Sequence, residues 1–364
     1  MALKVGIVGL PNVGKSTLFN AVSNSAKAQA SNYRFCTIEP NVGKVDVPDE
    51  RLDKLAELVI PERTVPTTIE FVDIAGLVKG ASKGEGLGNK FLANIREVDA
   101  IVHVIRCFED ENVLREEGEI NPVADKEIID TELQLKDVES VEKKMQRFEK
   151  IAKNDPKAKR VYDVLTQCHN HLMEGKNIRG LKLEGEDYEA IADLFLLTEK
   201  PVLFVANVDE AGMHTGNKYS EALQAAVKDE GAQVIVMNNT IEAQISEMEG
   251  EDKDLFLEEY SLTEPGLNRL IRAAYNLLNL ITYFTAGVQE VRAWTIERGW
   301  KAPQAAGVIH TDFEKGFIKA ETIAYNDYVS FGSETACKEN GKLRIEGKEY
   351  VVNDGDVMHF RFNV

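Results

Sequence analysis

The stretch Gly9-Leu10-Pro11-Asn12-Val13-Gly14-Lys15-Ser16-Thr17 decides the fold of this chain of 364 residues. Its two glycines frame four residues and precede a lysine and a hydroxyl, which is the pattern of a phosphate-binding loop. An apolar run, Val5–Val8, comes before it and a helical pattern, Thr17–Val22, follows. In this setting, backbone N–H groups at the helix start face bound phosphates. We therefore expect a nucleotide site here, against the alternative of a glycine turn that only packs a helix on a sheet.

The residue types in and after this loop indicate phosphoryl chemistry. Lys15 would place a positive charge at the outer phosphates, and the Ser16 hydroxyl would bind Mg²⁺. Asp73 follows the apolar run Ile69–Val72, where hydrolases of this class hold Mg²⁺ with an acidic residue. Gly76 could direct its N–H at the terminal phosphate because no side chain blocks the approach. The alternative for Asp73 is a cap of the following turn.

Two segments are candidates for loops that move with the nucleotide state. Residues 77–88 are rich in glycine and poor in core residues, and Thr37 could close over Mg²⁺ with its hydroxyl. Leu77 stands where many GTPases carry a glutamine that orients water, so we expect slow intrinsic hydrolysis. Asn12 could help to hold a monovalent cation such as K⁺, with a turn-forming asparagine as the alternative.

A third motif concerns the choice of base. The apolar run Pro201–Ala206 ends in Asn207, Val208, Asp209 and Glu210. Guanine-specific relatives carry Asn-Lys-x-Asp here, so Val208 replaces the lysine and Glu210 replaces the aspartate that pairs with guanine. We do not expect the longer glutamate to keep that bidentate geometry, and a site without the pair loses discrimination. Asn207 can still bond a purine edge. The spacing indicates relaxed specificity that leans towards ATP.

The composition limits the class of protein. With 43% hydrophobic and 29% charged residues the chain is typical of globular proteins, and no apolar run approaches the length that spans a bilayer. The N-terminus lacks the layout of a signal peptide, and the four cysteines are far apart, so we expect a cytoplasmic protein with reduced thiols. The net charge of −18 argues against nonspecific nucleic-acid binding over the whole surface.

Short apolar runs alternate with helical stretches through the first two thirds of the chain. Such runs predict an α/β fold with a mostly parallel sheet and ligands at the carboxyl ends of its strands. The expected strands are Leu3–Val8, Ile69–Val72, Ala100–Ile105, Pro201–Ala206 and Gln233–Val236.

Between residues 121 and 199 the pattern changes to two amphipathic stripes. Val138, Val141 and Met145 recur at helical spacing before the break Lys153–Pro156, and a second stripe begins at Val161. Two antiparallel helices inserted into the nucleotide domain explain this pattern.

A basic cluster lies around the break between these stripes. It carries a net charge of +6 over residues 143–160 and is the best local candidate for contact with RNA, against the alternative of a solvated helix face. Its basic members are Lys143, Lys144, Arg147, Lys150, Lys153, Lys157, Lys159 and Arg160.

The stretch from about residue 280 has alternating patterns between turns, which predict a small α+β domain with a mixed sheet. No pair of charged residues in it indicates a catalytic site, so we expect a recognition or docking module. The expected strands are Val291–Ile296, Lys319–Ala324, Lys348–Val352 and Val357–Phe362.

The motifs together resemble the YchF branch of the Obg superfamily, the Obg-like ATPases, over nearly the whole chain. The resemblance is carried by the phosphate loop and by the stretches 35–41, 73–89, 207–210, 283–295, 310–317 and 354–356. It implies a Ras-like phosphate-loop domain, an inserted helical coiled-coil hairpin and a C-terminal TGS domain of β-grasp type. It also implies ATP preferred over GTP, Mg²⁺ held by Ser16 and Thr37, and association with ribosomes.

The expected nucleotide contacts are Asn12, Val13, Gly14, Lys15, Ser16, Thr17, Asn207, Val208 and Glu210, the metal ligands Ser16, Thr37 and Asp73, and the catalytic groups Lys15, Gly76 and Arg115. Arg115 enters because the family often has a histidine after the Arg-Cys-Phe strand end, and here Leu114 and Arg115 follow instead. An arginine can stabilise developing charge but is a poor general base. The family's small-residue turn at the base is Asn238–Thr240 here, and Arg34 stands where a proline is usual.

These features predict a nucleotide domain over 1–120 and 200–279, a helical insertion over 121–199 and a TGS domain over 280–364. The leading interpretation is a monomeric, ribosome-associated regulatory ATPase that acts away from membranes. Three alternatives are a nucleotide-dependent adaptor with incidental hydrolysis, a conventional GTPase and a small-molecule kinase. The kinase is disfavoured because no acceptor-substrate domain is evident.

Overall fold

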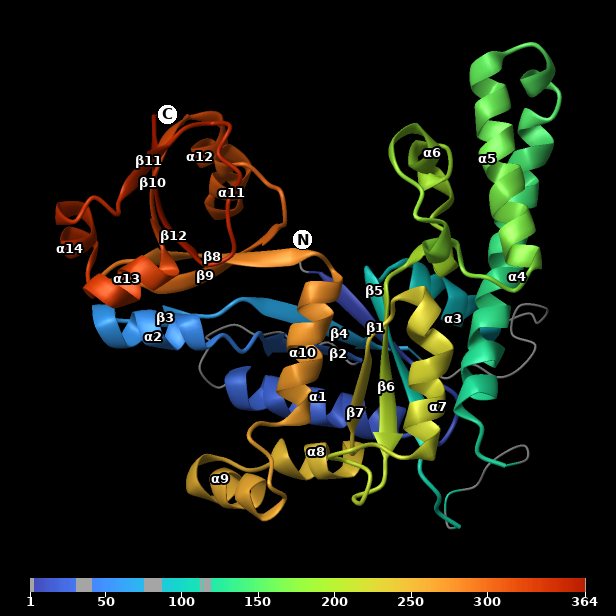
Figure 1. Cartoon of the computed structure of the whole chain (residues 1–364), viewed down its shortest axis with the longest axis horizontal. Coiled ribbons are helices and arrows are strands. Elements are labelled where there is room, and N and C mark those ends of the chain that lie inside the picture. The colour runs from blue at the N-terminus through green and yellow to red at the C-terminus, as the bar shows by residue number, and fades with distance from the viewer. Residues whose placement is uncertain (1–2, 31–40, 75–86, 112, 114–118, 364) are drawn as a thin grey trace. The chain divides into compact units, whose positions relative to one another are not determined.

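The structure is a computed structural model that describes residues 3–30, 41–74, 87–111, 113 and 119–363. The chain forms two compact units (Figure 1), of which the first comprises Met1–Val45 and Glu70–Leu270. The second comprises Asp46–Ile69 and Ile271–Val364. The segment 46–69 therefore folds with the C-terminal part of the chain, although no local pattern in the sequence predicts this. The three domain boundaries drawn from the sequence stay predictions.

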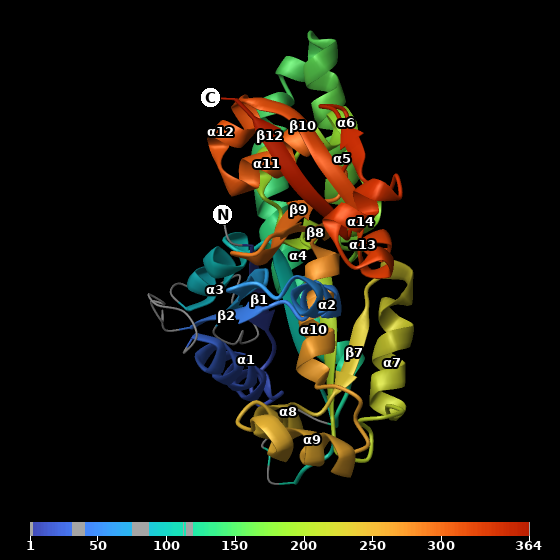
Figure 2. The same ribbon diagram turned by 90° about the vertical axis from the view of Figure 1, so that its left-hand side faces the viewer.

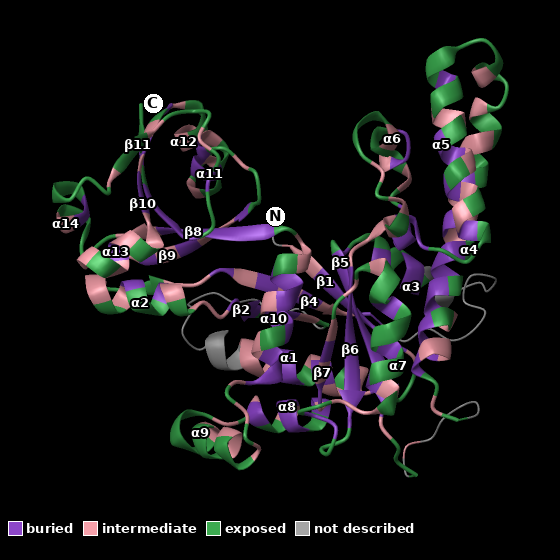
Figure 3. Ribbon diagram, viewed as in Figure 1, coloured by how far each residue is buried: buried purple, intermediate pink, exposed green. Residues whose placement is uncertain are grey.

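Six strands form the sheet of the first unit, in the order β2-β4-β1-β5-β6-β7. They are β1 (Lys4–Val8), β2 (Val42–Asp46), β4 (Thr68–Asp73), β5 (Ala100–Cys107), β6 (Val202–Val208) and β7 (Val234–Met237). The pairs β1–β4, β1–β5, β5–β6 and β6–β7 are parallel. Every residue of β5 and β6 is buried (Figure 3), as expected for central strands covered on both faces. The α/β architecture and its five predicted strands are confirmed, and β2 is an additional strand.

Helices pack against this sheet. The bounds are α1 (Lys15–Ala30), α3 (Leu87–Arg96), α7 (Lys218–Val227), α8 (Asn239–Ile245) and α9 (Gly250–Glu259), and α10 (Gly266–Leu277) leads into the second unit. One apolar core joins Phe91 and Ile95 of α3 and Leu223 of α7 to Ile105 of β5 and Phe204 of β6. The carboxyl ends of the strands, where ligands bind in such folds, are thereby held in place.

The two amphipathic stripes form the predicted antiparallel helical hairpin, drawn as the paired long ribbons of Figure 1. Its helices are α4 (Pro122–Phe148) and α5 (Pro156–Met173), joined by the 3₁₀ turn η1 (Ile151–Lys153). Each helix has proline in its first turn and a side-chain cap. The Asn121 side chain accepts from the Ala124 N–H, and the Asp155 side chain accepts from the Lys157 N–H. A separate apolar core that includes Val141, Leu165 and Cys168 holds the pair together.

After the hairpin the chain returns to β6 through short elements. These are η2 (Ile178–Leu181), α6 (Gly185–Glu189), η3 (Ala192–Leu194) and η4 (Leu197–Glu199). Asp137 of α4 is fully buried and accepts hydrogen bonds from the Leu197 and Thr198 N–H groups, each at 2.8 Å. The carboxylate therefore ties the return segment to the hairpin.

The second unit contains another six-stranded sheet, in the order β11-β10-β12-β8-β9-β3. Its strands are β3 (Thr64–Val65), β8 (Leu280–Ala286), β9 (Val291–Glu297), β10 (Phe317–Ala324), β11 (Arg344–Glu346) and β12 (Asp356–Phe362). Its helices are α2 (Glu50–Val59), α11 (Ala302–Ile309), α12 (Thr311–Lys315), α13 (Tyr325–Phe331) and α14 (Glu334–Glu339). The sheet is mixed, since β8 pairs antiparallel with β9 and β3 pairs parallel with β9, as the α+β prediction required.

Adjacent side chains of β8 face opposite sides of this sheet and enter two different cores. Tyr283 packs with Ala302 and Ala306 of α11, whereas Phe284 packs with Leu55 of α2 and Tyr328 of α13. Figure 2 shows the unit from a second direction, with α11 and α13 apart across the strands. The predicted strands Val291–Ile296, Lys319–Ala324 and Val357–Phe362 are confirmed.

The predicted strand Lys348–Val352 is wrong. The Tyr350 N–H donates to the Gly347 carbonyl oxygen at 3.2 Å and closes a turn there. Only Val351 makes a β-bridge, with Lys301. The alternating pattern predicts the strand a few residues too late, because the strand of this region is β11. Among the residues that the structure describes, no helix is both long and apolar enough to cross a membrane.

Candidate functional site: a phosphate loop and its supports

The segment between β1 and α1 has the geometry that the phosphate-binding pattern requires. Gly14 has a φ of +90°, and its carbonyl oxygen accepts a hydrogen bond from the Leu18 N–H at 3.0 Å. A Cβ atom at Gly14 would also collide with the side-chain amide of Asn207. Glycine is therefore required both for the positive φ and for the close approach of Asn207. Asn12 has a φ of 62°, a left-handed conformation that asparagine adopts more readily than most residues. That conformation agrees with the turn-forming role weighed for Asn12.

Lys15 and Asp73 meet at the end of this loop. Lys15 is the first residue of α1, Asp73 is the last of β4, and the lysine Nζ donates to a carboxylate oxygen of the aspartate. The parallel register of β1 and β4 sets Ile7 opposite Asp73, which explains how residues 58 positions apart come together. Ser16, next to Lys15, is exposed. A carboxylate and a hydroxyl at a phosphate loop are the oxygen ligands that Mg²⁺ takes, so these residues fit that ion.

Two asparagines support the phosphate loop from the ends of neighbouring strands. Asn207, the sixth residue of β6, donates from Nδ2 to the Val13 carbonyl oxygen at 3.0 Å. Its Oδ1 accepts from the Asn239 N–H at 3.0 Å. Asn239, at the start of α8, donates from Nδ2 to the Gly14 carbonyl oxygen at 3.1 Å. Both side chains are buried, and together they hold two successive carbonyl groups of the loop. The sequence reasoning proposed Asn207 only as a base contact and assigned Asn239 no side-chain role.

The remaining predicted base-pocket residues follow at the end of β6. Val208 is buried, and its carbonyl oxygen accepts a hydrogen bond from Asn238 Nδ2 at 2.9 Å. The Asp209 carboxylate accepts from the Gly212 N–H at 2.9 Å and so closes a turn. Glu210 is exposed. Asn207, Val208 and Glu210 thus lie beside the start of α8, and their contact with a base stays a prediction.

Arg106 organises the loop after β5 and was not assigned a role from the sequence. The side chain is 5% exposed, and its guanidinium lies 4.6 Å from the ring centroid of Phe108. Its three nitrogens donate to the carbonyl oxygens of Phe108, Asp110 and Val113 at 3.2, 3.1 and 3.1 Å. This is the loop that leads to Arg115, and the sequence signal for its support is an arginine near the end of a mostly apolar run.

Three predicted site residues, Thr37, Gly76 and Arg115, lie outside the described residues, and so do Leu77 and Arg34. The same holds for most of the predicted mobile segment 77–88. Their roles stay predictions.

The basic cluster of residues 143–160 occupies the end of α4, η1 and the start of α5, at the free end of the hairpin in Figure 1. Lys144 pairs with Asp193 and Arg160 pairs with Asp187, so these two charges are partly used within the chain. No ion pair of the other six basic residues occurs among the described residues, and all six are exposed: Lys143, Arg147, Lys150, Lys153, Lys157 and Lys159. The charge at this end is therefore available to a partner.

A buried ionic cluster lies where the hairpin meets the sheet. Lys126 of α4 contacts Asp130 and Glu230 at 2.6 Å each, and Arg179 contacts Glu230 at 2.8 Å. His103 of β5 lies within the electrostatic reach of this cluster and is 2% exposed. Burial, which disfavours the charged ring, lowers the pKa of His103 to about 4. The cluster and the neutral histidine couple the hairpin to the sheet.

Comparison with known proteins finds two family models that match the chain. One, the YchF-GTPase C-terminal family, described as a protein of unknown function, matches residues 280–363. The other, described as a 50S ribosome-binding GTPase, matches residues 4–157.

Full-length relatives are also found. The ribosome-binding ATPase YchF of Bacillus subtilis (strain 168) is 55% identical over 367 residues, and the protein of the same name from Haemophilus influenzae is 56% identical over 365 residues. Each alignment covers 100% of both proteins. The solved structure of the Schizosaccharomyces pombe YchF GTPase matches with a TM-score of 0.90 and 41% identity, and the match covers 99% of this chain and 97% of that one.

Proposed function

Because the chain belongs to the YchF family, we propose that it is a ribosome-associated phosphate-loop ATPase that slowly hydrolyses ATP and prefers it to GTP. The observation that carries the proposal is the meeting of Lys15 and Asp73 at the phosphate loop. A lysine for the outer phosphates and a carboxylate for Mg²⁺ are two of the recurring parts of phosphoryl-transfer sites.

Each group has a separate task in this proposal. The loop N–H groups and Lys15 bind the phosphates, and Mg²⁺ would be held by Ser16, Asp73 and Thr37. When bound, the ion neutralises charge on the transferred phosphoryl group. Gly76 and Arg115 are proposed to stabilise the terminal phosphate, and Leu77 in place of a water-orienting glutamine accounts for slow turnover. An additional K⁺ near Asn12 belongs to the same proposal.

The preference for ATP rests on the residues around the end of β6. Val208 and the exposed Glu210 replace the lysine and aspartate that recognise guanine. Adenine lacks the pair of N–H groups that such an aspartate accepts from, so the loss of that pair weakens guanine binding alone.

Association with the ribosome is supported by the names of the relatives and by the charge distribution. The B. subtilis and Escherichia coli O157:H7 proteins are named ribosome-binding ATPases. On a chain with a net charge of −18, the exposed basic end of the hairpin is suited to RNA phosphates. We propose that a monomer in the cytoplasm signals its nucleotide state through this end and the C-terminal unit.

Two variants at the site test the proposal. Lys15→Ala should abolish ATP binding, and Asp73→Asn should abolish hydrolysis because the loop remains but the carboxylate charge is lost. Ribosome pelleting with ATP, ADP or a non-hydrolysable analogue then distinguishes a switch from an adaptor with incidental hydrolysis. A switch predicts that Asp73→Asn binds ribosomes with ATP but is not released. Normal release would favour the adaptor, and unchanged hydrolysis in both variants would refute the proposal.

A further inference from the structure

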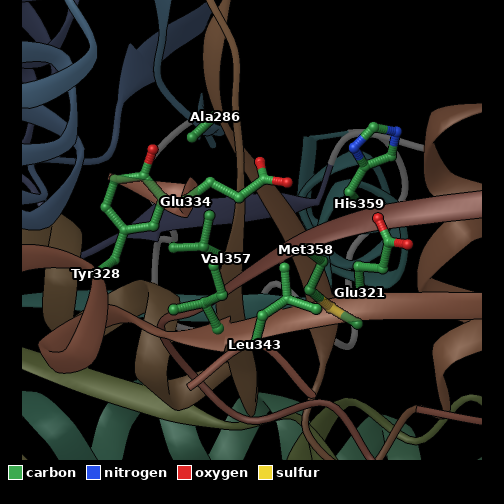
Figure 4. A pocket seen from close by; sticks show the side chains of 9 residues that line it. Ala286, Glu321, Tyr328, Glu334, Leu343, Val357, Met358 and His359 are labelled. Carbon is green, nitrogen blue, oxygen red and sulfur yellow. The ribbon is translucent and has the colours of Figure 1, made fainter. Parts of the chain in front are cut away.

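Three side chains that the nucleotide chemistry does not use converge on one face of the C-terminal unit. Glu321 of β10 lies directly opposite His359 of β12 in the antiparallel register, so both project from the same face of the sheet. Glu334, the first residue of α14, reaches the same place. Figure 4 shows the Glu334 carboxylate extending towards the His359 ring and the Glu321 carboxylate turned towards the same ring.

The geometry points to a site for a divalent transition metal, and we propose that Glu321, Glu334 and His359 bind Zn²⁺. One ligand atom from each residue lies within 4.8 Å of the other two. Zinc bonds of about 2.0–2.2 Å need donors that are closer together than this. Rotation of the exposed Glu334 and His359 side chains can supply that movement while β10 and β12 stay fixed.

The donor set decides the class of ion. One imidazole nitrogen and two carboxylates suit zinc or its neighbours in the first transition row, whereas Mg²⁺ favours oxygen ligands alone. A small pocket of about 20 Å³ adjoins the three residues and has apolar walls that include Ile323, Leu343 and Val357. That space is roughly the size of one water molecule, so water could complete the coordination.

The surrounding charges set the strength of the site. Arg361 Nη2 donates to Glu321 at 3.0 Å, and Lys319 Nζ lies 3.4 Å from the other oxygen of that carboxylate. No ion pair of Glu334 occurs in the part of the chain that the structure describes, so its charge is available to the metal. The two basic neighbours compete with the ion, and we expect micromolar rather than nanomolar affinity.

Zinc titration of the untagged full-length protein tests the inference. Calorimetry with ZnCl₂ in excess MgCl₂, without nucleotide, should show one equivalent that raises the melting temperature. His359→Asn and Glu334→Gln should each weaken this equivalent at least tenfold. The matched control is His310→Asn, because His310 is also exposed and lies 3.3 Å from a carboxylate, that of Asp312.

A second readout makes the test independent of folding. Co²⁺ added in place of Zn²⁺ should give an absorption spectrum of imidazole coordination that His359→Asn removes. Because both positions are exposed, neither His359→Asn nor Glu334→Gln should change the melting temperature of the protein in EDTA. Equal zinc binding by wild type, His359→Asn and Glu334→Gln would overturn the site, as would the absence of a zinc equivalent in the wild type. ATP hydrolysis is not expected to change in either variant, which separates this inference from the proposed function.

Discussion

The side-chain amide of Asn207 lies 3.0 Å from the carbonyl oxygen of Val13 and joins the end of β6 to the phosphate loop across 194 positions of sequence. The same side chain accepts from the Asn239 N–H, and Asn239 in turn holds the Gly14 carbonyl oxygen. The strand that is proposed to read the base therefore also fixes the loop that binds the phosphates. We therefore expect base recognition and phosphate binding to be coupled through Asn207.

This link predicts a specific defect for Asn207→Asp. The new carboxylate can still accept from the Asn239 N–H but cannot donate to the Val13 carbonyl oxygen. A buried acceptor left without its donor costs about 1–3 kcal/mol, so ATP affinity should fall roughly tenfold or more. Calorimetric titration measures the change, with the exposed Asn340→Asp as the control. Wild-type affinity in Asn207→Asp would show that the loop needs no support from β6.

Arg106 is predicted to act on turnover rather than on binding. Arg106→Lys keeps the charge but cannot reproduce three hydrogen bonds to the following loop, each worth about 1.5–3 kcal/mol for a charged donor. If that loop positions Arg115, both Arg106→Lys and Arg115→Ala should lower the ATPase rate about tenfold with ATP affinity retained. Arg147→Lys on the hairpin is the matched control. A normal rate in Arg115→Ala would remove that residue from the mechanism.

The buried His103 makes the stability of the protein sensitive to acid. The unfolded chain binds a proton there near pH 6.5, whereas the folded chain does so only near a pKa of about 4. The stabilisation is therefore complete above about pH 6.5 and is lost as the pH falls towards 4. At pH 5 the loss amounts to about 2 kcal/mol.

Denaturant unfolding at several pH values measures this effect. His103→Leu should flatten the decline in the free energy of unfolding between pH 7 and pH 5, because the apolar side chain binds no proton. His214→Leu, at an exposed position, should follow the wild type. An identical decline in wild type and His103→Leu would assign the acid sensitivity to the carboxylates of the neighbouring cluster.

The basic end of the hairpin is predicted to contribute to ribosome association through phosphate contacts. A triple change of Lys150, Lys153 and Lys157 to glutamate should weaken association at least tenfold and flatten its salt dependence, because each lost phosphate contact removes counterion release. The matched control changes Lys182, Lys218 and Lys228, which are exposed lysines of the first unit outside the basic cluster. Equal weakening by both triple variants would mean that general charge, rather than the hairpin, is responsible.

Local sequence signals predicted the elements that carry the site. Glycine spacing predicts the phosphate loop, and apolar runs predict the strands that end near Asp73 and Asn207. The helical spacing of apolar residues predicts the hairpin. All three are short-range patterns. The supports escaped prediction because they depend on contacts between distant segments. Nothing in the sequence around Asn239 predicts that its amide contacts Gly14. Arg106 donates to carbonyl groups of a loop, and the positions of those groups cannot be predicted from the sequence.

The second unit shows the same limit. No local pattern in the segment 46–69 predicts that it pairs with residues 291–292. The pair β3–β9 depends on a contact between regions that are distant in the sequence. The turn at Gly347 also displaced a strand that alternation alone had suggested.

The central claim is that this phosphate loop serves an ATP-driven, ribosome-associated cycle, and calorimetric titration of the nucleotide-free protein with ATP and GTP analogues in Mg²⁺, with and without ribosomes, tests it most directly. The account predicts tighter binding of the ATP analogue and an affinity that ribosomes change. Tighter binding of the GTP analogue would contradict the account, because Glu210 would then still serve guanine and the protein would be a conventional GTPase.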